Sequence, residues 1–206
     1  YAAEELVADR PFRSMLMMAA LFHDITKPAH RSVNEHSKIK FIGHEISGAR
    51  VFAERAAELR LSNAEIRRVR RMIEGHDRPW QMSKQAALPS RKTVYQFWNT
   101  YGDAGVGICL LSLADTLAVY GHTITPQIIT KRVDVARTLL EAYWENPDQV
   151  EPAALLNGNE IMRMLNLPPG PQVGELLAKL REAQAVGEVQ DKEQALTFVE
   201  KVLSEL

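Results

Sequence analysis

The sequence of 206 residues contains one cysteine, Cys109, and almost no excess of charge of either sign. A single cysteine excludes an intrachain disulfide, and its apolar surroundings indicate a small buried side chain in a reducing compartment. A net charge of −1 excludes a global basic field of the kind that collects nucleic acid, although a local basic patch remains compatible with it. We therefore expect a cytoplasmic protein whose partners cannot be read from its bulk charge.

Long apolar runs and strand patterns are also missing. No stretch of about 18 uncharged apolar residues occurs, and no signal peptide with a basic start and an apolar core can be recognised, so we expect no membrane partner. β-Branched residues alternating with polar ones are absent, which predicts no strands. Because the chain begins at Tyr1 rather than Met, we expect an N-terminal portion of the natural protein to precede it.

Helical periodicity is present almost throughout, and it predicts an all-α fold. Residues 15–22 are apolar on nearly every face, which predicts a central helix covered on all sides. From residue 151 onward we expect a separate small module of three short helices, broken at Pro168-Pro169-Gly170 and at Gly187. Between these segments we expect helices within residues 41–60 and 62–76, the second capped by Ser62 or Asn63, then a looser segment over 77–91 and helices around Tyr95 and Leu113. A further helix is expected from Thr125 to Glu145, with Thr125 and Pro126 in the cap and first-turn positions.

The stretch AALFHDITKP places His23 and Asp24 side by side at the end of the apolar helix. A buried charge without a partner is costly, so two ionisable groups in such a place normally have a partner or a metal ion. Asp115 raises the same question, because it is the only charge within ICLLSLADTLAVY. The alternative for Asp115 is a hydrogen bond to Ser112 or to a neighbouring backbone group.

Two further histidines, His44 and His76, stand beside a glycine at or near a helix end, where a side chain can turn inward. Alone, each is interpreted as a surface or hydrogen-bonded core residue. Together with His23, Asp24 and Asp115, they form a set of imidazoles and carboxylates spread over four apolar helices. Such donors suit divalent manganese, iron, zinc, cobalt or nickel, or magnesium with more water. A bound ion of this kind would lower the pKa of a water and neutralise a phosphate.

As a set, the motifs LFHDITKP, GHEISGA, EGH and LADTLA resemble the HD superfamily of metal-dependent phosphohydrolases. The resemblance implies that His23, Asp24 and Asp115 bind a metal whose bound water becomes the nucleophile. It also implies that His44 and His76 bind a second metal or the substrate phosphate.

The segment from Leu156 to Leu203 resembles the C-terminal tail of bacterial tRNA nucleotidyltransferases of the CCA-adding and poly(A) polymerase family, many of which carry an HD domain before that tail. The two resemblances occur in the order expected for such proteins. They imply an HD-type metal-binding domain over residues 1–122, a connecting helix over 123–150 and a helical tail module over 151–206.

The sequence departs from these families in two places. The superfamily pattern opens with a histidine upstream of the doublet, whereas His23 is the first histidine here, so either that ligand lies before Tyr1 or the site is degenerate. The catalytic head of a nucleotidyltransferase needs a Gly-Ser pair followed by two carboxylates one residue apart, and this sequence contains neither Gly-Ser nor Asp-x-Asp. CCA addition therefore cannot be performed by these residues alone.

Basic side chains give weaker signals. Arg67 and Arg71 share one face of the helix EIRRVRR and are candidates for contacting an RNA backbone, although the nearby Glu65 and Glu74 favour a solvated, ion-paired face. Lys27, which follows the doublet, is a candidate for neutralising a phosphate, and a solvated helix-end lysine is the alternative.

Two functions are compatible with these residues. The first is an HD-type metal-dependent phosphohydrolase that cleaves phosphomonoesters or 2′,3′-cyclic phosphodiesters, on a phosphorylated small molecule or an RNA 3′ end, with His23, Asp24 and Lys27 as catalytic residues. The second is a noncatalytic body that positions tRNA for a nucleotidyltransferase head, with the HD residues kept only as structure. Metal content discriminates between the two.

Overall fold

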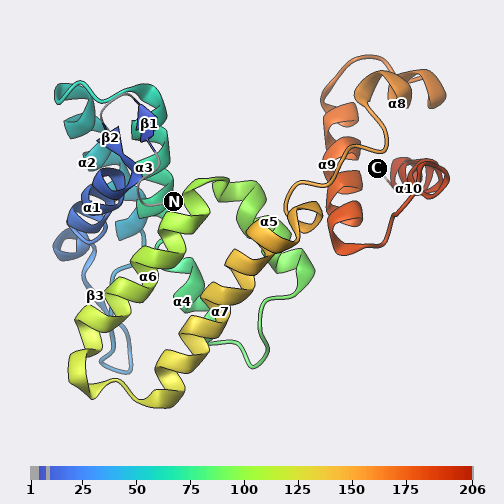
Figure 1. The fold of residues 1–206 in the computed structure, drawn as a ribbon. Helices are drawn as coiled ribbons and strands as arrows, with labels where there is room; N and C mark the ends of the chain where they lie inside the picture. Colours follow the sequence, from blue (N-terminus) through green and yellow to red (C-terminus); the bar gives the residue numbers. More distant parts are fainter. Residues whose placement is uncertain (1–4, 8–9, 206) are drawn as a thin grey trace. The chain divides into compact units, whose positions relative to one another are not determined.

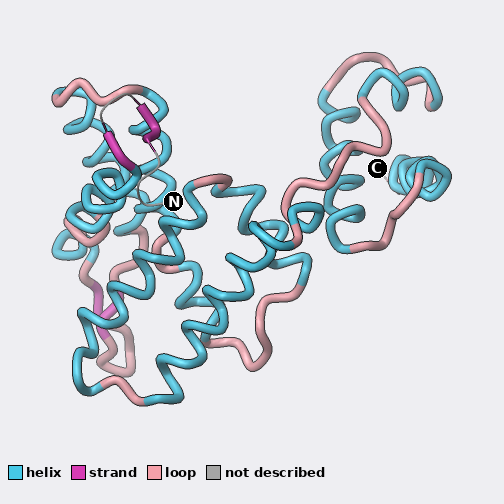
Figure 2. Tube along the Cα trace, in the orientation of Figure 1, coloured by secondary structure: helices cyan, strands magenta, loops and turns pink. Residues whose placement is uncertain are grey.

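A computed structural model describes residues 5–7 and 10–205 of the chain, and helices dominate it (Figure 1, Figure 2). The predicted all-α fold is confirmed. The chain forms two compact units, unit 1 with residues 1–88 and 101–140 and unit 2 with residues 89–100 and 141–206. The domain boundaries given above stay predictions.

Unit 1 is built around a central helix that differs from the one expected. Its helices are α1 (Phe12–Phe22), η1 (Lys27–His30), α2 (His44–Glu58), α3 (Asn63–Gly75), α4 (Arg78–Ser83), α6 (Ala104–Tyr120), η2 (Gly121–Thr123) and most of α7 (Pro126–Glu145). The helix that packs against α1, α2 and α6 is α3. The side chains of Met17 and Leu21 are 64% and 73% exposed. The prediction that α1 is covered on all sides is therefore wrong, and its apolar face is partly open to solvent.

Two glycines allow α3 and α6 to approach closely. A Cβ added to Gly75 would lie 2.5 Å from Ile108 Cδ1, and one added to Gly107 would lie 2.7 Å from Met72 Sδ. Neither position has room for a larger side chain without a shift of packed core atoms. This contact fixes where α3 ends relative to α6, and thereby where the residues at the end of α3 lie.

Short strands occur where none were expected. β1 (Glu5–Val7) pairs with β2 (Arg10–Pro11), and β3 (Ser32–Val33) pairs with β4 (Ile39–Lys40), both antiparallel. In the loop between β3 and β4, the Asn34 side chain accepts hydrogen bonds from the backbone N–H groups of His36 and Lys38. Such strands are too short to produce an alternating pattern, so they cannot be seen in the periodicity.

Helix starts agree with the predicted caps. Ser62 closes a capping box with Glu65 at the start of α3. In α7 the first residue is Pro126, and the hydroxyl of Thr125 accepts a hydrogen bond from the Ile128 N–H at 3.4 Å. The segment expected to be looser contains the short helix α4, which the sequence did not indicate.

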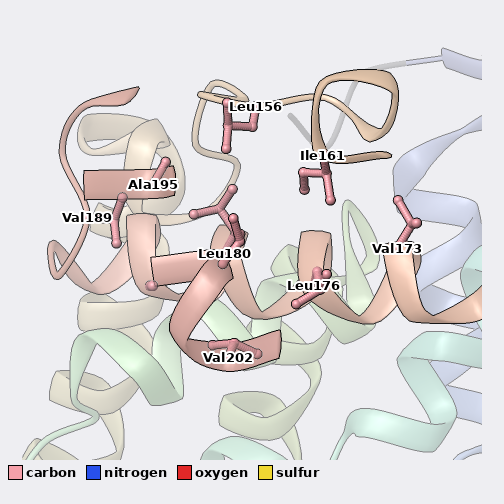
Figure 3. Packing of buried hydrophobic residues seen from close by; sticks show 10 residues of the cluster. Leu156, Ile161, Val173, Leu176, Leu180, Val189, Ala195 and Val202 are labelled. Carbon is pink, nitrogen blue, oxygen red and sulfur yellow. The ribbon is translucent and has the colours of Figure 1, made fainter. Parts of the chain in front are cut away.

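Unit 2 contains α5 (Arg91–Tyr101) except its last residue, the end of α7, η3 (Pro147–Gln149) and three further helices, α8 (Gly158–Met164), α9 (Pro171–Val186) and α10 (Lys192–Ser204). The three short helices predicted after residue 151 are confirmed. Their common core joins Leu156 with Leu176 and Leu180 of α9 and Val202 of α10 (Figure 3).

One helical stretch in the described part of the chain, Ala104–Thr123, is long and apolar enough to cross a membrane by length and composition. Half of its most apolar window is buried inside the structure. A core helix of a soluble protein meets the same criterion, so this single stretch is weak evidence for a membrane span.

Candidate metal centre

The predicted ligands come from the ends or the body of four helices of unit 1, α1, α2, α3 and α6 (Figure 1). His23 is the C-cap residue of α1, and Asp24 follows it. His44 is the first residue of α2, and His76 is the C-cap residue of α3. Asp115 lies in the C-terminal half of α6. His44 and His76 are 3% and 2% exposed, so both histidines beside a glycine do turn inward.

The Asp24 carboxylate is the centre of this cluster. His44 Nε2 lies 3.3 Å and His76 Nε2 3.7 Å from Asp24 Oδ1, while His23 Nε2 lies 3.3 Å from Oδ2. The Nε2 atoms of His44 and His76 are 3.4 Å apart, and His23 Nε2 is 3.5 Å from Asp115 Oδ1. Ligand atoms of His23, His44 and His76 therefore surround Asp24, and Asp115 joins the cluster through its contact with His23.

Each imidazole is oriented through its other nitrogen. The Nδ1 atoms of His23, His44 and His76 lie 2.8, 2.7 and 2.7 Å from the backbone carbonyl oxygens three residues earlier. A carbonyl oxygen can only accept, so Nδ1 carries the proton and donates it. Burial lowers the pKa values of His23 and His44, but the carboxylates they face outweigh it and raise both, so in the metal-free cluster their Nε2 atoms carry a proton toward Asp24. Release of that proton exposes the Nε2 lone pair that a metal ion takes up.

The donor set fits a divalent ion. With metal–ligand bonds of about 2.0 to 2.1 Å, neighbouring ligand atoms are about 3.0 to 3.4 Å apart, close to the spacings found here. His23 Nε2 and Asp24 Oδ1 are enclosed and make no hydrogen bond of regular geometry. Ligand atoms of His23, Asp24 and His76 lie within 4.8 Å of one another, as do those of His44, His76 and Asp77. A shared cation would satisfy these otherwise unpaired atoms.

The electrostatics of the metal-free cluster also favour a cation at its centre. Burial lowers the pKa of His23, but the carboxylates of Asp115 and Asp24 outweigh it and raise that pKa to about 10. For Asp24, burial raises the pKa, yet His23, His44 and Lys27 together bring it well below its usual range. In His76, burial lowers the pKa, which favours the neutral ring.

Asp115 contacts His23, whereas the alternative interpretation gave it a hydrogen bond to Ser112 or a nearby backbone group. Contact with the His23 imidazole lowers the pKa of Asp115, and burial opposes this effect. The Ser112 carbonyl accepts its hydrogen bond from the Thr116 hydroxyl, at 2.7 Å. The carboxylate is partly exposed, so it faces the cluster from the side that is open to solvent.

The cluster borders a cavity of about 530 Å³ in unit 1. Lys27 lines it and donates to Asp24 Oδ2 at 2.6 Å, so this lysine is ion-paired and differs from the solvated helix-end alternative. Lys27 Nζ also lies 5.7 Å from the centre of the Phe41 ring. The other walls include His44, Asp115 and Trp80.

Two residues of this region were not singled out from the sequence. Asp77 Oδ1 lies 3.6 Å from His76 Nε2, and the only local signal for it is its place directly after that histidine. Arg132 of α7 reaches the same cavity, and no local signal marks it, because α7 has an ordinary mixed pattern of apolar and charged residues.

Arg67 and Arg71 lie apart from the cluster. Both are exposed on α3 and line a polar cleft of about 320 Å³ with Arg68 and Asp103. The Arg68 guanidinium is 3.2 Å from the Asp103 carboxylate. The RNA contact expected of Arg67 and Arg71 stays a prediction.

Comparison with known proteins agrees with this geometry. Over 97% of its length the chain is 30% identical to an A-adding tRNA nucleotidyltransferase of Deinococcus radiodurans, and over 88% it is 32% identical to a CC-adding tRNA nucleotidyltransferase of Thermus thermophilus. It spans 44% and 38% of those two proteins, less than half of each. The HD domain family matches residues 1–120, which include every residue of the histidine and aspartate cluster. The chain therefore belongs to the HD domain family.

Proposed function

We propose that the chain is a metal-dependent phosphohydrolase that cleaves phosphomonoesters or 2′,3′-cyclic phosphodiesters. The observation that carries this proposal is the convergence of three imidazole Nε2 atoms on the Asp24 carboxylate, beside a cavity that His44 and Asp115 line. A structural cluster needs no cavity beside it, whereas a catalytic one needs room for a substrate.

In the proposed site, His23, Asp24 and Asp115 hold a divalent ion of the manganese, iron, zinc, cobalt, nickel or magnesium type. Such an ion supplies an activated water and neutralises phosphate charge. His44 and His76 hold a second ion or the substrate phosphate. The hydrogen bonds from their Nδ1 atoms to backbone carbonyls keep both rings in place during the reaction.

Lys27 is the proposed phosphate contact. One N–H of its ammonium group is used by Asp24, and the remaining two are available to phosphate oxygens in the cavity. The same ion pair holds Asp24 in its orientation, so Lys27 both positions a ligand and offers positive charge to the substrate.

The test is hydrolysis of a nucleoside 2′,3′-cyclic phosphate and of a nucleotide monophosphate in the presence of manganese. We expect His23→Ala or Asp24→Asn to reduce the rate at least about 100-fold, while His36→Ala, an exposed histidine in the β3–β4 loop, changes nothing. Affinity for RNA that lacks a terminal 3′ phosphate should be nearly unchanged in all three variants. Equal rates for the parent and His23→Ala would refute the catalytic assignment.

A noncatalytic tRNA-binding body is the second candidate. It is supported by the two relatives described above, both tRNA nucleotidyltransferases, and by the lack of nucleotidyltransferase head motifs in this sequence. In that role, Arg67 and Arg71 would contact the RNA backbone. A protein that binds tRNA but takes up no divalent ion would favour this candidate over the first.

A further inference from the structure

We propose that the cavity beside the metal centre binds the last two nucleotides of an RNA 3′ end, and that Arg132 of α7 holds the phosphate that links them. The terminal phosphate would lie at the metal centre, so this part rests on the proposed function. The phosphate contact proposed for Arg132 is supported by separate observations, and it can be tested by measuring ligand affinity without turnover.

Arg132 is a half-buried cation whose protein partners are neutral. Its Nη1 donates to Thr116 Oγ1 at 2.6 Å, and its Nη2 donates to the Tyr120 hydroxyl at 3.4 Å. Because the Thr116 hydroxyl uses its own proton on the Ser112 carbonyl, it can accept this bond. No carboxylate of the described residues lies within 4.0 Å of the guanidinium. A guanidinium held in a cavity without a carboxylate favours an anionic ligand.

The charges of the cavity fall into two zones. Carboxylates occur where the imidazoles are, as with Asp77 beside His76 and Asp115 beside His23. The third carboxylate of the lining, Glu45, also lies beside an imidazole, that of His44. The other charged side chains that line the cavity are basic: Lys27, which is paired with Asp24, and Lys40, Lys84 and Arg132. An ion at the metal centre would offset the carboxylates there. The remaining positive charge then matches a ligand with a second anionic group away from the metal.

The distance between the metal centre and Arg132 can be judged from positions along α6. Asp115 faces the metal centre, and the guanidinium of Arg132 spans Thr116 and Tyr120, up to five residues further along the same helix. Five residues of α-helix cover about 7.5 Å, which is the upper value for this spacing along the helix axis. This is the scale of one backbone repeat of a polynucleotide, so one nucleotide can bridge the metal centre and Arg132.

The cavity continues past Arg132. A second cleft of about 310 Å³ shares Trp80, Lys84 and Arg132 with the first and has no acidic side chain in its lining. The Lys84 ammonium group lies over the Trp80 ring. Aromatic rings with interleaved cations are the usual platform for single-stranded nucleic acid. A free mononucleotide would need only the first cavity, whereas an RNA end would continue into the second.

The experiment compares a ribonucleoside with a diribonucleotide by calorimetry, on the full chain with manganese present. Each ligand carries a non-hydrolysable 3′-phosphonate in place of the terminal phosphate, so that nothing is hydrolysed. We expect the parent to bind the dinucleotide at least about tenfold more tightly, because one charge-assisted contact is added. Arg132→Gln should remove most of this preference and affect the mononucleotide less. The matched control is Arg137→Gln, an exposed arginine of the same helix that is paired with Asp134.

Equal affinity of the parent for both ligands would overturn the inference, whatever the variants do. So would an Arg132→Gln protein that melts like the parent and keeps the preference. If Arg132→Gln does not fold, Arg132→Lys replaces it and should keep part of the preference. If the parent hydrolyses its substrates but does not prefer the dinucleotide, the proposed function stands and this inference fails. If the parent prefers the dinucleotide but hydrolyses nothing, the Arg132 contact stands and the proposed function fails.

Discussion

Two imidazoles of the cluster also provide hydrogen bonds to backbone carbonyl groups at helix ends. The last four carbonyl groups of an α-helix have no partner within the helix. His23 and His76 stand at the ends of α1 and α3, and their rings donate to the Ala20 and Ile73 carbonyls in those last turns. Each of these two histidines thus gives a hydrogen bond to a carbonyl group that has no partner within its helix. The same bond orients the ring so that its Nε2 atom faces Asp24. A side chain of another type at either position would lose both effects.

Asp115 provides a residue-level prediction. We expect Asp115→Asn to change the free energy of unfolding of the metal-free protein by less than about 1 kcal/mol, because His23 Nε2 keeps its contact with Asp24. Added metal at about 100 times its dissociation constant should stabilise the parent by about 2.7 kcal/mol, and the variant should lose most of that gain. Thermal melts of both proteins, with chelator and with manganese or zinc, measure these changes. A loss of stability in Asp115→Asn that is the same with and without metal would identify Asp115 as a purely structural acid.

At the residue scale, the sequence predicted those site residues whose charge contrasts with the apolar residues around them. Asp115 in an apolar helix and His23-Asp24 after an apolar run are visible because a charge is out of place there. Arg132 is not visible in this way, since an arginine in α7 fits the local pattern. Its importance comes from a contact with Thr116, sixteen residues earlier, which only the packed structure supplies.

At the scale of elements, the packing of α3 on α6 positions the cluster. Gly75 directly precedes His76, and a Cβ at this position would lie 2.8 Å from Tyr101 Cε1 as well as 2.5 Å from Ile108 Cδ1. These contacts involve core side chains that are buried on all sides. The end of α3 must therefore shift if a methyl group is added, and His76 would shift with it.

We expect Gly75→Ala to destabilise the protein by about 1 to 3 kcal/mol, because it overpacks this contact. It should also weaken metal binding by displacing His76. The matched control is Gly174→Ala in α9, where an added Cβ meets no atom within 4 Å and helix propensity should add up to about 1 kcal/mol of stability. Denaturant melts and metal titrations of both variants test this, and an unchanged metal affinity in Gly75→Ala would contradict the positioning argument.

Most elements could be predicted because they carry local signals. The caps at Ser62 and Thr125 and the breaks at Pro168-Pro169-Gly170 and Gly187 act through the backbone of their own segment, so the sequence displays them directly. The strands β3 and β4 carry no such signal, because two paired residues on each side are held by Asn34 and by the fold around them. The exposed face of α1 was missed for a related reason: an apolar face does not reveal whether a neighbour covers it.

At the scale of the whole molecule, the chain consists of two compact units, and only one of them contains the proposed metal centre. All residues of the proposed metal centre belong to unit 1, and the core of α8, α9 and α10 belongs to unit 2. Each unit has its own buried apolar residues, such as Met72 and Ile108 in the first and Leu176 and Leu180 in the second. Stability and metal binding should therefore be separable by mutation.

We expect Leu180→Ala to cost unit 2 about 2 to 5 kcal/mol of stability, because it opens a cavity in a fully packed core. The affinity for metal should stay within about twofold of the parent. In calorimetric melts, metal should shift the transition of unit 1, and Leu180→Ala should shift that of unit 2. A large loss of metal affinity in Leu180→Ala would contradict the separation of the chain into two units.

The central claim is that the Nε2 atoms gathered at Asp24 hold a divalent metal ion. Its most direct test is a calorimetric titration of the metal-free protein with manganese and with zinc, in parallel with His23→Ala and with His36→Ala as the control. We predict saturable binding of at least one equivalent by the parent and by His36→Ala, with a loss of at least about tenfold in affinity for His23→Ala. Absence of binding by the parent, or equal binding by the parent and His23→Ala, would contradict the claim.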